Sequence, residues 1–452
     1  MIMKRVLLLL WVLAISFATM AQSDTTNSEK KVKKGLSLGP LPVVAYDSDL
    51  GFQYGALVNF YFYGDGSSYP QYKHLLYVQA SYSTKGSGIF RLFYDSDQIL
   101  KNKDKYLRLS VDLSYLLESG LGFYGFNGFE TNYNPTFETT DDPSYITWVY
   151  YRQNRSLLRF QADVQGRIIG KKLRWVFGMA RMDFKLKSVD VDVLNEGKTD
   201  NLLPDTISLY DDYVSYGLID KQEADGGALT MVKGGLVWDT RDLEANPNKG
   251  LWDEVVLYTF PGFLGNKENT FTGITIIHRQ YFTLVEKRLT FAYRLGYKGI
   301  IKGKSPFYFD PYMVSSYSLA ANREGLGGAG TFRGMLRNRV VGDGFGWGNF
   351  CLRYKFWYFN FLGNPTYLAL NGFFDMGQVF QPRAIDPVIK KQMESDYPGR
   401  YFNASSDRMH YSFGGGIHFA MNENFVVRVN YGKVLDAQDG TGSLYITTNW
   451  IF

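Results

Sequence analysis

The stretch from residue 288 to residue 298 reads RLTFAYRLGYK, and its pattern decides the fold class. Aliphatic and aromatic side chains recur at every second position: Leu289, Phe291, Tyr293, Leu295 and Tyr297. The residues between them are small, polar or basic. Because successive side chains of a β-strand point to opposite faces, the stretch predicts a strand with one apolar and one wet face. The same alternation runs through 105–115 and 157–168.

The composition indicates where such strands lie. Aromatic residues make up 17% of the 452-residue chain, yet the mean hydropathy is slightly negative at -0.21. A membrane barrel places aromatic side chains outward at the lipid interfaces and keeps charges in a polar lumen. Strands survive in hydrocarbon only when the sheet closes, because every backbone group must then be paired internally. We therefore predict an all-β fold, a transmembrane antiparallel β-barrel, rather than a soluble β-sandwich.

The alternating segments divide the chain into about sixteen strands, an even number as such barrels require. The predicted strands lie near 37–45, 50–63, 73–84, 88–97, 103–116, 146–169, 172–188, 227–239, 251–259, 269–284, 287–300, 347–359, 365–379, 409–420, 425–433 and 443–452. The long connections (117–145, 189–226, 301–346 and 380–408) all follow odd-numbered strands. Since these barrels have long extracellular loops and short periplasmic turns, both ends of the barrel sequence are expected in the periplasm.

The first residues indicate export. Lys4 and Arg5 precede an apolar run and a small-residue stretch that ends at Ala21, the order of segments found in a cleaved signal peptide. We predict a signal peptide at 1–21, a periplasmic lead-in at 22–36 and the barrel at 37–452. Cys351 is the only cysteine, which excludes an intrachain disulfide. These features predict a protein of the bacterial outer membrane.

Four segments of the second half carry a resemblance. GLVWDTRDLEANPNKG at 235–250 runs from a strand into a charged turn, and TFRGM at 331–335 lies in the longest loop. FFDMG occupies 373–377, and 444–452 reads LYITTNWIF. Together, and in this order, they resemble the BamA/TamA superfamily, also called the bacterial surface antigen family. Its members show a D-x-R-D…P…G turn, an R-G-[FY] loop tip, an F-x-D-x-G strand and an aromatic C-terminus.

The resemblance implies that the long loop folds into the lumen, where Arg333, next to Gly334, meets Asp375. A guanidinium and a carboxylate can pair through two hydrogen bonds, so this contact would act as a latch for the loop. The alternative is an ordinary lumenal ion pair. The sequence departs from the family at Met335, which stands where an aromatic residue usually follows R-G. It departs again at Cys351, where members often have Glu, so a third latch partner is expected to be missing.

The resemblance also assigns the periplasmic turn motif to Asp239, Arg241, Asp242 and Gly250. Family members such as BamA carry periplasmic POTRA domains before the barrel. Residues 22–36 are too few for one such domain, so we expect a barrel without POTRA domains. Any delivery of client proteins would then require a separate periplasmic or membrane partner.

Two prolines mark the expected seam between the first and last strands. Pro40 and Pro42 are two residues apart, so their missing N–H groups would face the same edge of the sheet. If that edge faces the last strand, which ends at Phe452, closure there is weak and a lateral opening is feasible. Equally, both prolines could belong to the lead-in below the membrane.

Other kinds of chemistry find little support in the sequence. No Ser-His-Asp order, phosphate loop or cysteine cluster is present, so we expect neither an enzyme nor a cofactor. His410 and His418 share one face of a strand but are too far apart to bind one metal, and no metal site is expected. The net charge of +5 has no clustered basic face, which argues against nucleic acid as a partner.

Two functions remain open at this point. The resemblance favours protein insertion or translocation at the outer membrane, with outer-membrane lipid and client proteins as partners. The alternative is a passive pore or a structural subunit of an outer-membrane complex.

Overall fold

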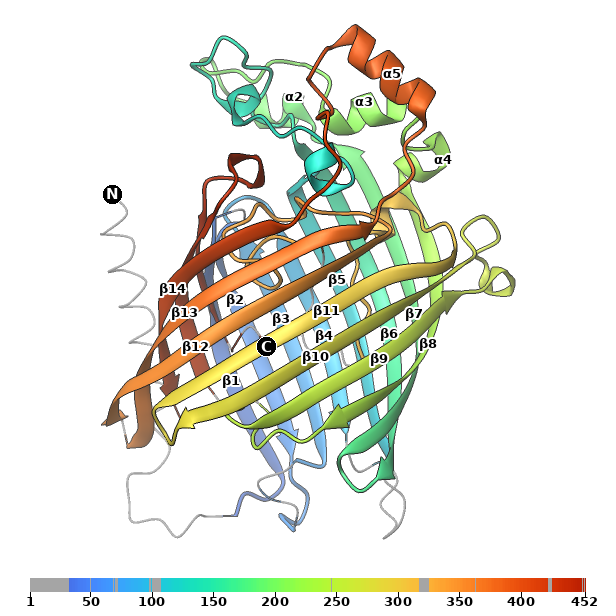
Figure 1. The fold of residues 1–452 in the computed structure, drawn as a ribbon. Coiled ribbons are helices and arrows are strands. Elements are labelled where there is room, and N and C mark those ends of the chain that lie inside the picture. The colour runs from blue at the N-terminus through green and yellow to red at the C-terminus, as the bar shows by residue number, and fades with distance from the viewer. Residues whose placement is uncertain are drawn as a thin grey trace.

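The computed structural model shows sixteen antiparallel strands joined into one closed barrel. It describes residues 32–452 except 49, 68, 70, 71, 97, 98, 100–106, 245, 317–324, 362, 422–424, 449 and 451. The predicted signal peptide and residues 22–31 of the lead-in lie outside the described residues. Each strand pairs with its neighbours in sequence, and the first strand also pairs with the last (Figure 1).

The strand bounds are β1 Leu36–Asp47, β2 Gly51–Phe62, β3 His74–Ser83, β4 Gly88–Ser96, β5 Leu107–Gly122, β6 Arg152–Ile169, β7 Leu173–Ser188, β8 Gly226–Asp239, β9 Gly250–Phe260, β10 Phe271–Val285, β11 Leu289–Gly303, β12 Gly344–Phe361, β13 Asn364–Gln381, β14 His410–Met421, β15 Phe425–Val434 and β16 Ser443–Thr448. The prediction of an antiparallel barrel with sixteen strands is confirmed. The long connections follow the odd-numbered strands, so one end of the barrel carries the loops and the other carries the turns.

Strand faces follow the alternation of the sequence. On β12, Asn349, Cys351 and Arg353 are buried, whereas Leu352 and Tyr354, which alternate with them, are 45% and 44% exposed. The outward face is therefore apolar and the inward face carries polar and charged groups. This arrangement suits a barrel surrounded by lipid, because the charges pair with one another inside the lumen.

Short helices lie in the long connections and gather at the loop end (Figure 1). They are η1 Gly128–Glu130, η2 Pro135–Glu138, α2 Val191–Asn195, α3 Leu209–Ser215, α4 Lys221–Ala224, η3 Gly262–Leu264, η4 Phe307–Phe309, α5 Pro387–Asp396 and η5 Ala437–Asp439. Helix α3 begins with a capping box formed by Ser208 and Asp211, which satisfies two free N–H groups of its first turn. Among the described residues, none of the helices combines the length and apolar character needed to cross a bilayer.

Three predicted boundaries were wrong by more than a few residues. The fifth strand ends at Gly122 rather than 116. The sixth strand begins at Arg152 rather than 146, because the residues before it pack among the loops. The last strand ends at Thr448 rather than 452. Trp450 and Phe452, predicted to continue it, are only 7% and 6% exposed, and Phe452 packs among side chains of the inner wall.

Candidate functional site in the lumen and seam

The connection between β11 and β12 spans residues 304–343. Its described part, 304–316 and 325–343, fills part of the lumen, and we call it the plug loop. All five residues of its tip, 331–335, are buried, and the tip makes polar contacts with β12, β13 and β16. Phe332 and Met335 of the tip also belong to an apolar cluster with residues of the barrel wall. The polar contacts fix the loop at one depth and one register, because each requires a defined geometry.

Arg333 and Asp375 meet inside the barrel. The Arg333 Nη2 and Nε groups donate to the two Asp375 carboxylate oxygens at 2.6 and 2.9 Å, and the Arg333 main-chain N donates to the same carboxylate at 2.9 Å. Both side chains are at most 1% exposed. The guanidinium also lies 3.6 Å above the Phe373 ring and donates to the Cys351 sulfur at 3.4 Å. Cys351, at the position where a third latch partner was expected to be missing, therefore acts as a weak hydrogen-bond acceptor.

Gly334 brings the loop tip against the last two strands. Its main-chain N donates to the Tyr445 hydroxyl on β16 at 3.1 Å. A Cβ atom at this position would lie 2.6 Å from the Gly432 carbonyl carbon on β15, and the φ angle of +91° also favours glycine. The tip consequently connects β13, through Asp375, with the closing strands of the barrel.

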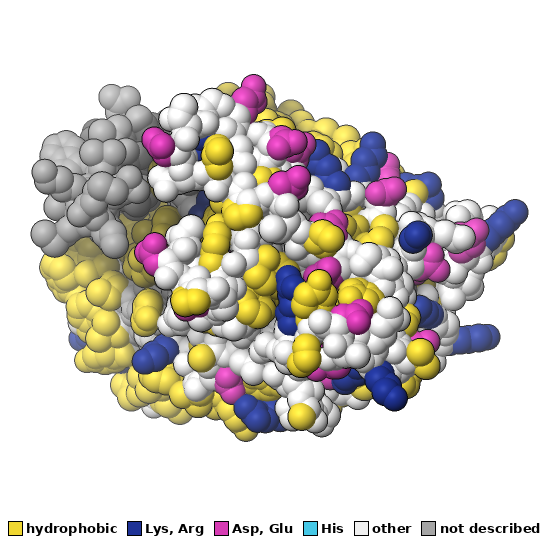
Figure 2. Space-filling model, turned by 90° about the horizontal axis from the view of Figure 1, so that it is seen from above, with side chains coloured by type: hydrophobic (Ala, Val, Ile, Leu, Met, Phe, Trp, Pro, Cys, Tyr) yellow, Lys and Arg dark blue, Asp and Glu magenta, His cyan; other side chains and the backbone are white. Residues whose placement is uncertain are grey.

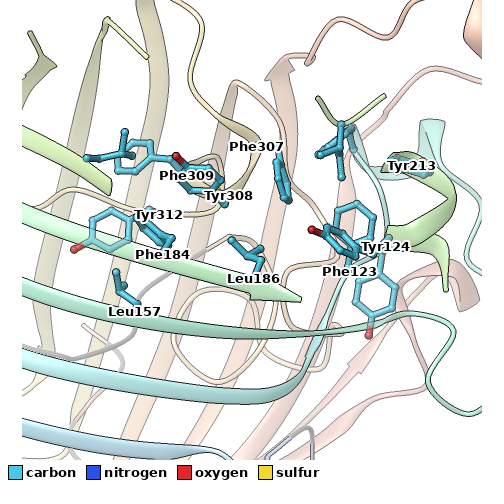
Figure 3. Close-up of a cluster of buried hydrophobic side chains, with 14 of the residues drawn as sticks. Phe123, Tyr124, Leu157, Phe184, Leu186, Tyr213, Phe307, Tyr308, Phe309 and Tyr312 are labelled. Carbon is cyan, nitrogen blue, oxygen red and sulfur yellow. The ribbon is translucent and has the colours of Figure 1, made fainter. Parts of the chain in front are cut away.

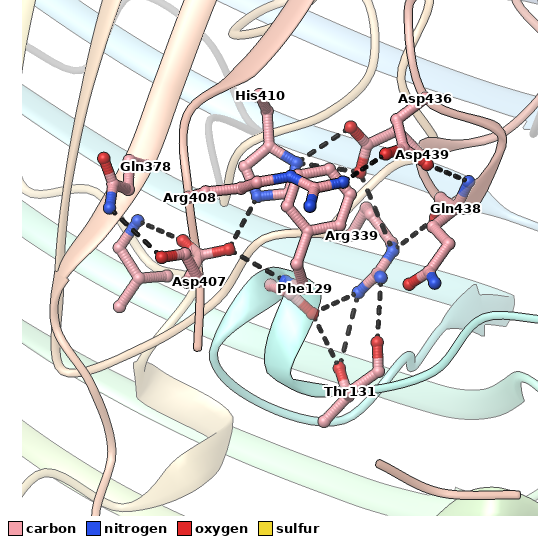
Figure 4. A network of polar contacts seen from close by, with 12 residues as sticks. Phe129, Thr131, Arg339, Gln378, Asp407, Arg408, His410, Asp436, Gln438 and Asp439 are labelled. Atoms are coloured by element: carbon pink, nitrogen blue, oxygen red, sulfur yellow. Dashed lines mark hydrogen bonds and ion pairs between the residues drawn. The ribbon is translucent and has the colours of Figure 1, made fainter. Parts of the chain in front are cut away.

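Two further arginines of the plug loop were not identified from the sequence. Arg337 pairs with Glu118 on β5, and Glu118 also pairs with Arg155 on β6. Arg339 is fully buried and donates to main-chain oxygens of Gly128, Thr131 and Gln438 at distances from 2.6 to 3.0 Å (Figure 4). The signal available was the close spacing of three arginines at 333, 337 and 339. Their partners lie on other loops and strands, which no local pattern reveals.

A second polar network joins the loops above the plug. The His410 ring lies between two carboxylates, with Nδ1 2.8 Å from Asp439 and Nε2 2.9 Å from Asp407 (Figure 4). Asp407 also accepts hydrogen bonds from the main-chain N atoms of Phe129 and Val379, both at 2.8 Å. These contacts join residues that are far apart in the sequence, so the loop end behaves as one packed layer.

Aromatic side chains from several connections complete this layer, which we call the aromatic dome. Figure 3 shows how they gather from β5–β7 and the loops above them, with the Phe123 ring in contact with the rings of Tyr213 and Phe307. The buried dome residues are Phe123, Tyr124, Phe126, Tyr133, Tyr150, Tyr151, Leu209, Tyr210, Tyr213, Phe307, Tyr308, Phe309, Tyr312, Tyr401 and Phe402. Seen from above, loop side chains cover most of this end, with charged groups scattered among apolar ones (Figure 2).

The dome contains a buried acid with an altered pKa. Burial raises the pKa of Asp212 on α3 to about 6, although its carboxylate accepts a hydrogen bond from the Tyr401 hydroxyl at 3.0 Å. The folded dome thus favours the protonated carboxyl. The stability that this carboxyl gives the dome is greatest below about pH 4, the ordinary pKa of an aspartate, and falls as the pH rises to about 6.

We therefore expect Asp212→Asn to strengthen the dome at pH 7.5 by at most about 3 kcal/mol and to remove this pH dependence. Hydrogen exchange of the amides in 209–215, followed from pH 4 to pH 8, measures the effect. Asp141→Asn, at an exposed loop position, is the matched control and should leave the profile unchanged. A wild-type dome that loosens on acidification instead would contradict the prediction.

The turn motif between β8 and β9 folds beneath the lumen. Arg241 binds Asp239 through two nitrogens at 3.0 and 3.1 Å and lies 4.4 Å above the Trp252 ring. Asp242 accepts main-chain hydrogen bonds from three turn residues, Leu243, Asn248 and Lys249. Gly250 has a φ of +95°, and a Cβ atom there would collide with the Thr240 carbonyl. The motif is thus a rigid turn.

The same turn reaches the inner wall. Asn246 donates to the Tyr367 hydroxyl on β13 at 2.6 Å, and Lys355 on β12 donates to the Asn248 side chain at 2.8 Å. Arg353 donates to the main-chain oxygen of Pro247 at 3.3 Å. The turn therefore closes part of the turn end of the barrel.

The seam between β1 and β16 is short. In the described residues only Tyr46 with Ile446 and Asp47 with Tyr445 are paired, whereas the next shortest ladder, β15 with β16, has six pairs. The Ser48 hydroxyl extends the seam by bonding the main-chain N and O of Leu444 at 3.0 and 3.3 Å.

The two prolines lie within the first strand rather than below it. Pro40 is opposite Val58 and Pro42 is opposite Ala56 on β2. Residues of one parity on an antiparallel strand direct their backbone groups to the same neighbour. Because proline cannot donate, both are accommodated where the N side faces away from β2, toward the edge beside β16.

The described residues contain no group of three or more histidine, cysteine, aspartate or glutamate side chains arranged to hold a metal ion. The candidate site consists of three structural features: the latched tip of the plug loop, the β8–β9 turn and the short β1–β16 seam. A closed barrel with an apolar outer face, a polar inner face and a loop packed in its lumen defines an integral outer-membrane β-barrel.

Comparison with known proteins agrees with this class. Residues 76–449 match the model of the Omp85 superfamily domain, and the chain belongs to this superfamily. Omp85 barrels lie in the bacterial outer membrane, as predicted for this chain. No protein of curated function gives a significant sequence match.

Two solved structures share the fold. The crystal structure of BamA from Haemophilus ducreyi lacking POTRA domains 1–3 matches with a TM-score of 0.54 and 13% identity, covering 92% of this chain and 70% of that one. CdiB from Escherichia coli matches with a TM-score of 0.52 and 10% identity, covering 91% of this chain but only 62% of that one. The likeness in fold to BamA agrees with the resemblance found in the sequence.

Proposed function

We propose that this barrel inserts proteins into the outer membrane or translocates them across it, using the β1–β16 seam as the site of client contact. The observation that carries the proposal is that, within the described part of the chain, the seam has two pairs and every other ladder has six or more. An unpaired strand edge is a template for another strand, so the edge of β1 can accept a client segment by β-augmentation.

The contacts inside the lumen favour the seam, rather than the lumen, as the route that client proteins take. The plug loop is held by Asp375, Glu118 and the loop contacts of Arg339, and the aromatic dome lies above it. A passive pore needs an open water path, which these contacts obstruct. A structural subunit without client contact remains as the outcome to which the experiment below can point.

Photo-crosslinking in living cells tests the proposal. A photoreactive amino acid at Val43 on β1 or Ile446 on β16 should capture newly exported outer-membrane proteins. The same residue at Leu158, which faces outward on β6 and is 47% exposed, is the matched control and should capture lipid or nothing. If Val43 and Ile446 crosslink only to the neighbouring strand, the seam stays closed in the cell and the barrel is a structural subunit or pore.

A separate partner for client delivery belongs to the same proposal. The turn end presents the β8–β9 turn and the edge of β1 close to the periplasm, where such a partner would bind. Proteins that crosslink to Leu243, a turn residue 39% exposed, would identify it.

A further inference from the structure

The C-terminal residues of the chain occupy a site in the lumen. Strand β16 ends at Thr448, and Phe452 packs into a small cluster with Tyr281, Ala292, Cys351 and Phe373. Trp450 is buried near it and contacts the His418 ring, with 4.4 Å between the ring centroids. The end of the last strand is therefore fastened inside the barrel rather than to β1.

Arg353 makes the polar contacts of this site. Its Nη2 donates to the main-chain oxygen of Phe452 at 3.2 Å, and its guanidinium lies 4.1 Å from the centre of the Trp450 ring. The side chain is 1% exposed, and none of the described Asp or Glu side chains forms an ion pair with it. Burying a guanidinium is costly, so its contacts with the Phe452 oxygen, the Trp450 ring and the Pro247 oxygen must offset that cost.

The register of the seam explains why these residues do not pair with β1. Tyr46 pairs with Ile446, and in an antiparallel ladder four residues back on one strand correspond to four residues forward on the other. A continued ladder would therefore place Pro42 opposite Trp450 and Pro40 opposite Phe452. Both positions of β1 lack the N–H group that such pairs require, so the lumen site competes with a weakened ladder.

The same side chains also hold the tip of the plug loop. Arg333 lies on the Phe373 ring and donates to the Cys351 sulfur, and Phe452 belongs to the same buried cluster as these two residues. Gly334 adds a direct contact to β16 through the Tyr445 hydroxyl. Displacement of the C-terminal residues would uncover the side chains against which the loop tip rests.

We propose that Arg353 is a positioning residue of the seam that links the last strand to the plug loop. It holds Trp450 and Phe452 in the lumen, so that the short seam and the latched loop tip form one coupled state. Loosening either part loosens the other, because both depend on Cys351 and Phe373. The consequence for client entry rests on the proposed function, whereas the coupling itself does not.

Cys351 provides the measurement, since it is the only cysteine of the chain and is 2% exposed. The rate at which N-ethylmaleimide modifies Cys351 in the folded full-length barrel in detergent reports how often the cluster opens. We expect Arg353→Met to raise this rate at least about tenfold, through a larger population of the open form. Arg353→Lys, which keeps a cation, should give an intermediate rate.

Lys355→Met is the matched control, because it removes a neighbouring lumenal cation that donates to Asn248 of the turn and lies over the Tyr367 ring. Its labelling rate should equal that of the wild type. Folding is judged by the migration of unheated protein on a denaturing gel. If Arg353→Met does not fold, Phe452→Ala is used instead, because it removes the packed ring and leaves the buried cation in place. A wild-type rate in a folded variant of either kind overturns the proposal.

A double-mutant cycle separates coupling from simple loss of packing. Asp375→Asn frees the loop tip, and Arg353→Met frees the C-terminal residues. Coupled contacts predict that the double variant is labelled no faster than the faster single variant. Separate openings would add their labelling rates, and independent contributions to one opening would multiply their factors. A double variant labelled faster than either single variant overturns the proposal. No client protein is present, so a failure here is distinct from a failure of the crosslinking experiment on function.

Discussion

Asp375→Asn is expected to release the tip of the plug loop and to lower the free energy of unfolding by about 3–5 kcal/mol. The substitution leaves the fully buried Arg333 guanidinium without its counter-charge and weakens three hydrogen bonds. Unfolding in urea, followed on a gel that separates folded from unfolded barrel, measures the change. Trypsin should then also cleave at Arg333, which is protected in the wild type.

Two further variants define what this result means. Lys73→Gln breaks an ion pair with Asp65, whose side chain is 66% exposed, and should leave the free energy of unfolding nearly unchanged. Arg333→Met combined with Asp375→Leu removes both charges and should be less destabilising than Asp375→Asn alone, since no buried ion is left unpaired. An asparagine variant as stable as the wild type would mean that water reaches the pair, which would then be an ordinary lumenal ion pair.

Locking the seam is expected to have the largest effect on activity. Tyr46 and Ile446 are paired across the seam, so cysteines at both positions lie within reach of a disulfide, in a Cys351→Ser background. Oxidation should abolish insertion of client barrels into proteoliposomes, because the edge of β1 can no longer be exposed. Reduction with dithiothreitol should restore the activity.

A disulfide between Ala162→Cys on β6 and Met179→Cys on β7 is the matched control. These residues are paired in a long ladder on another part of the barrel, and their crosslink should leave insertion unchanged. Full activity of the oxidised seam variant would show that the function does not depend on seam opening. The role of a pore or structural subunit would then be favoured.

The family was recognisable because its signals are local. The turn motif around Asp239, the loop tip at Arg333 and the strand around Asp375 each occupy a few consecutive residues. The parity of Asp375 predicted its lumenal side, because alternation assigns a face to every residue of a strand. Arg337 and Arg339 were missed for the opposite reason. Their partners come from β5, from the connection after β5 and from the connection after β15, which approach them only in the closed barrel.

The sequence by itself determined the all-β barrel, the number of strands and the orientation of loops and turns. These properties follow from a period of two and from the positions of turn residues, which are encoded over short distances. Only the tertiary structure decided where the last strand stops. Pro40 and Pro42 remove donors from one edge, and Arg353 with the cluster around Cys351 holds Trp450 and Phe452 inside the lumen. That outcome is a competition between two sets of contacts, one across the seam and one across the lumen. Both sets join residues that closure of the barrel alone brings together.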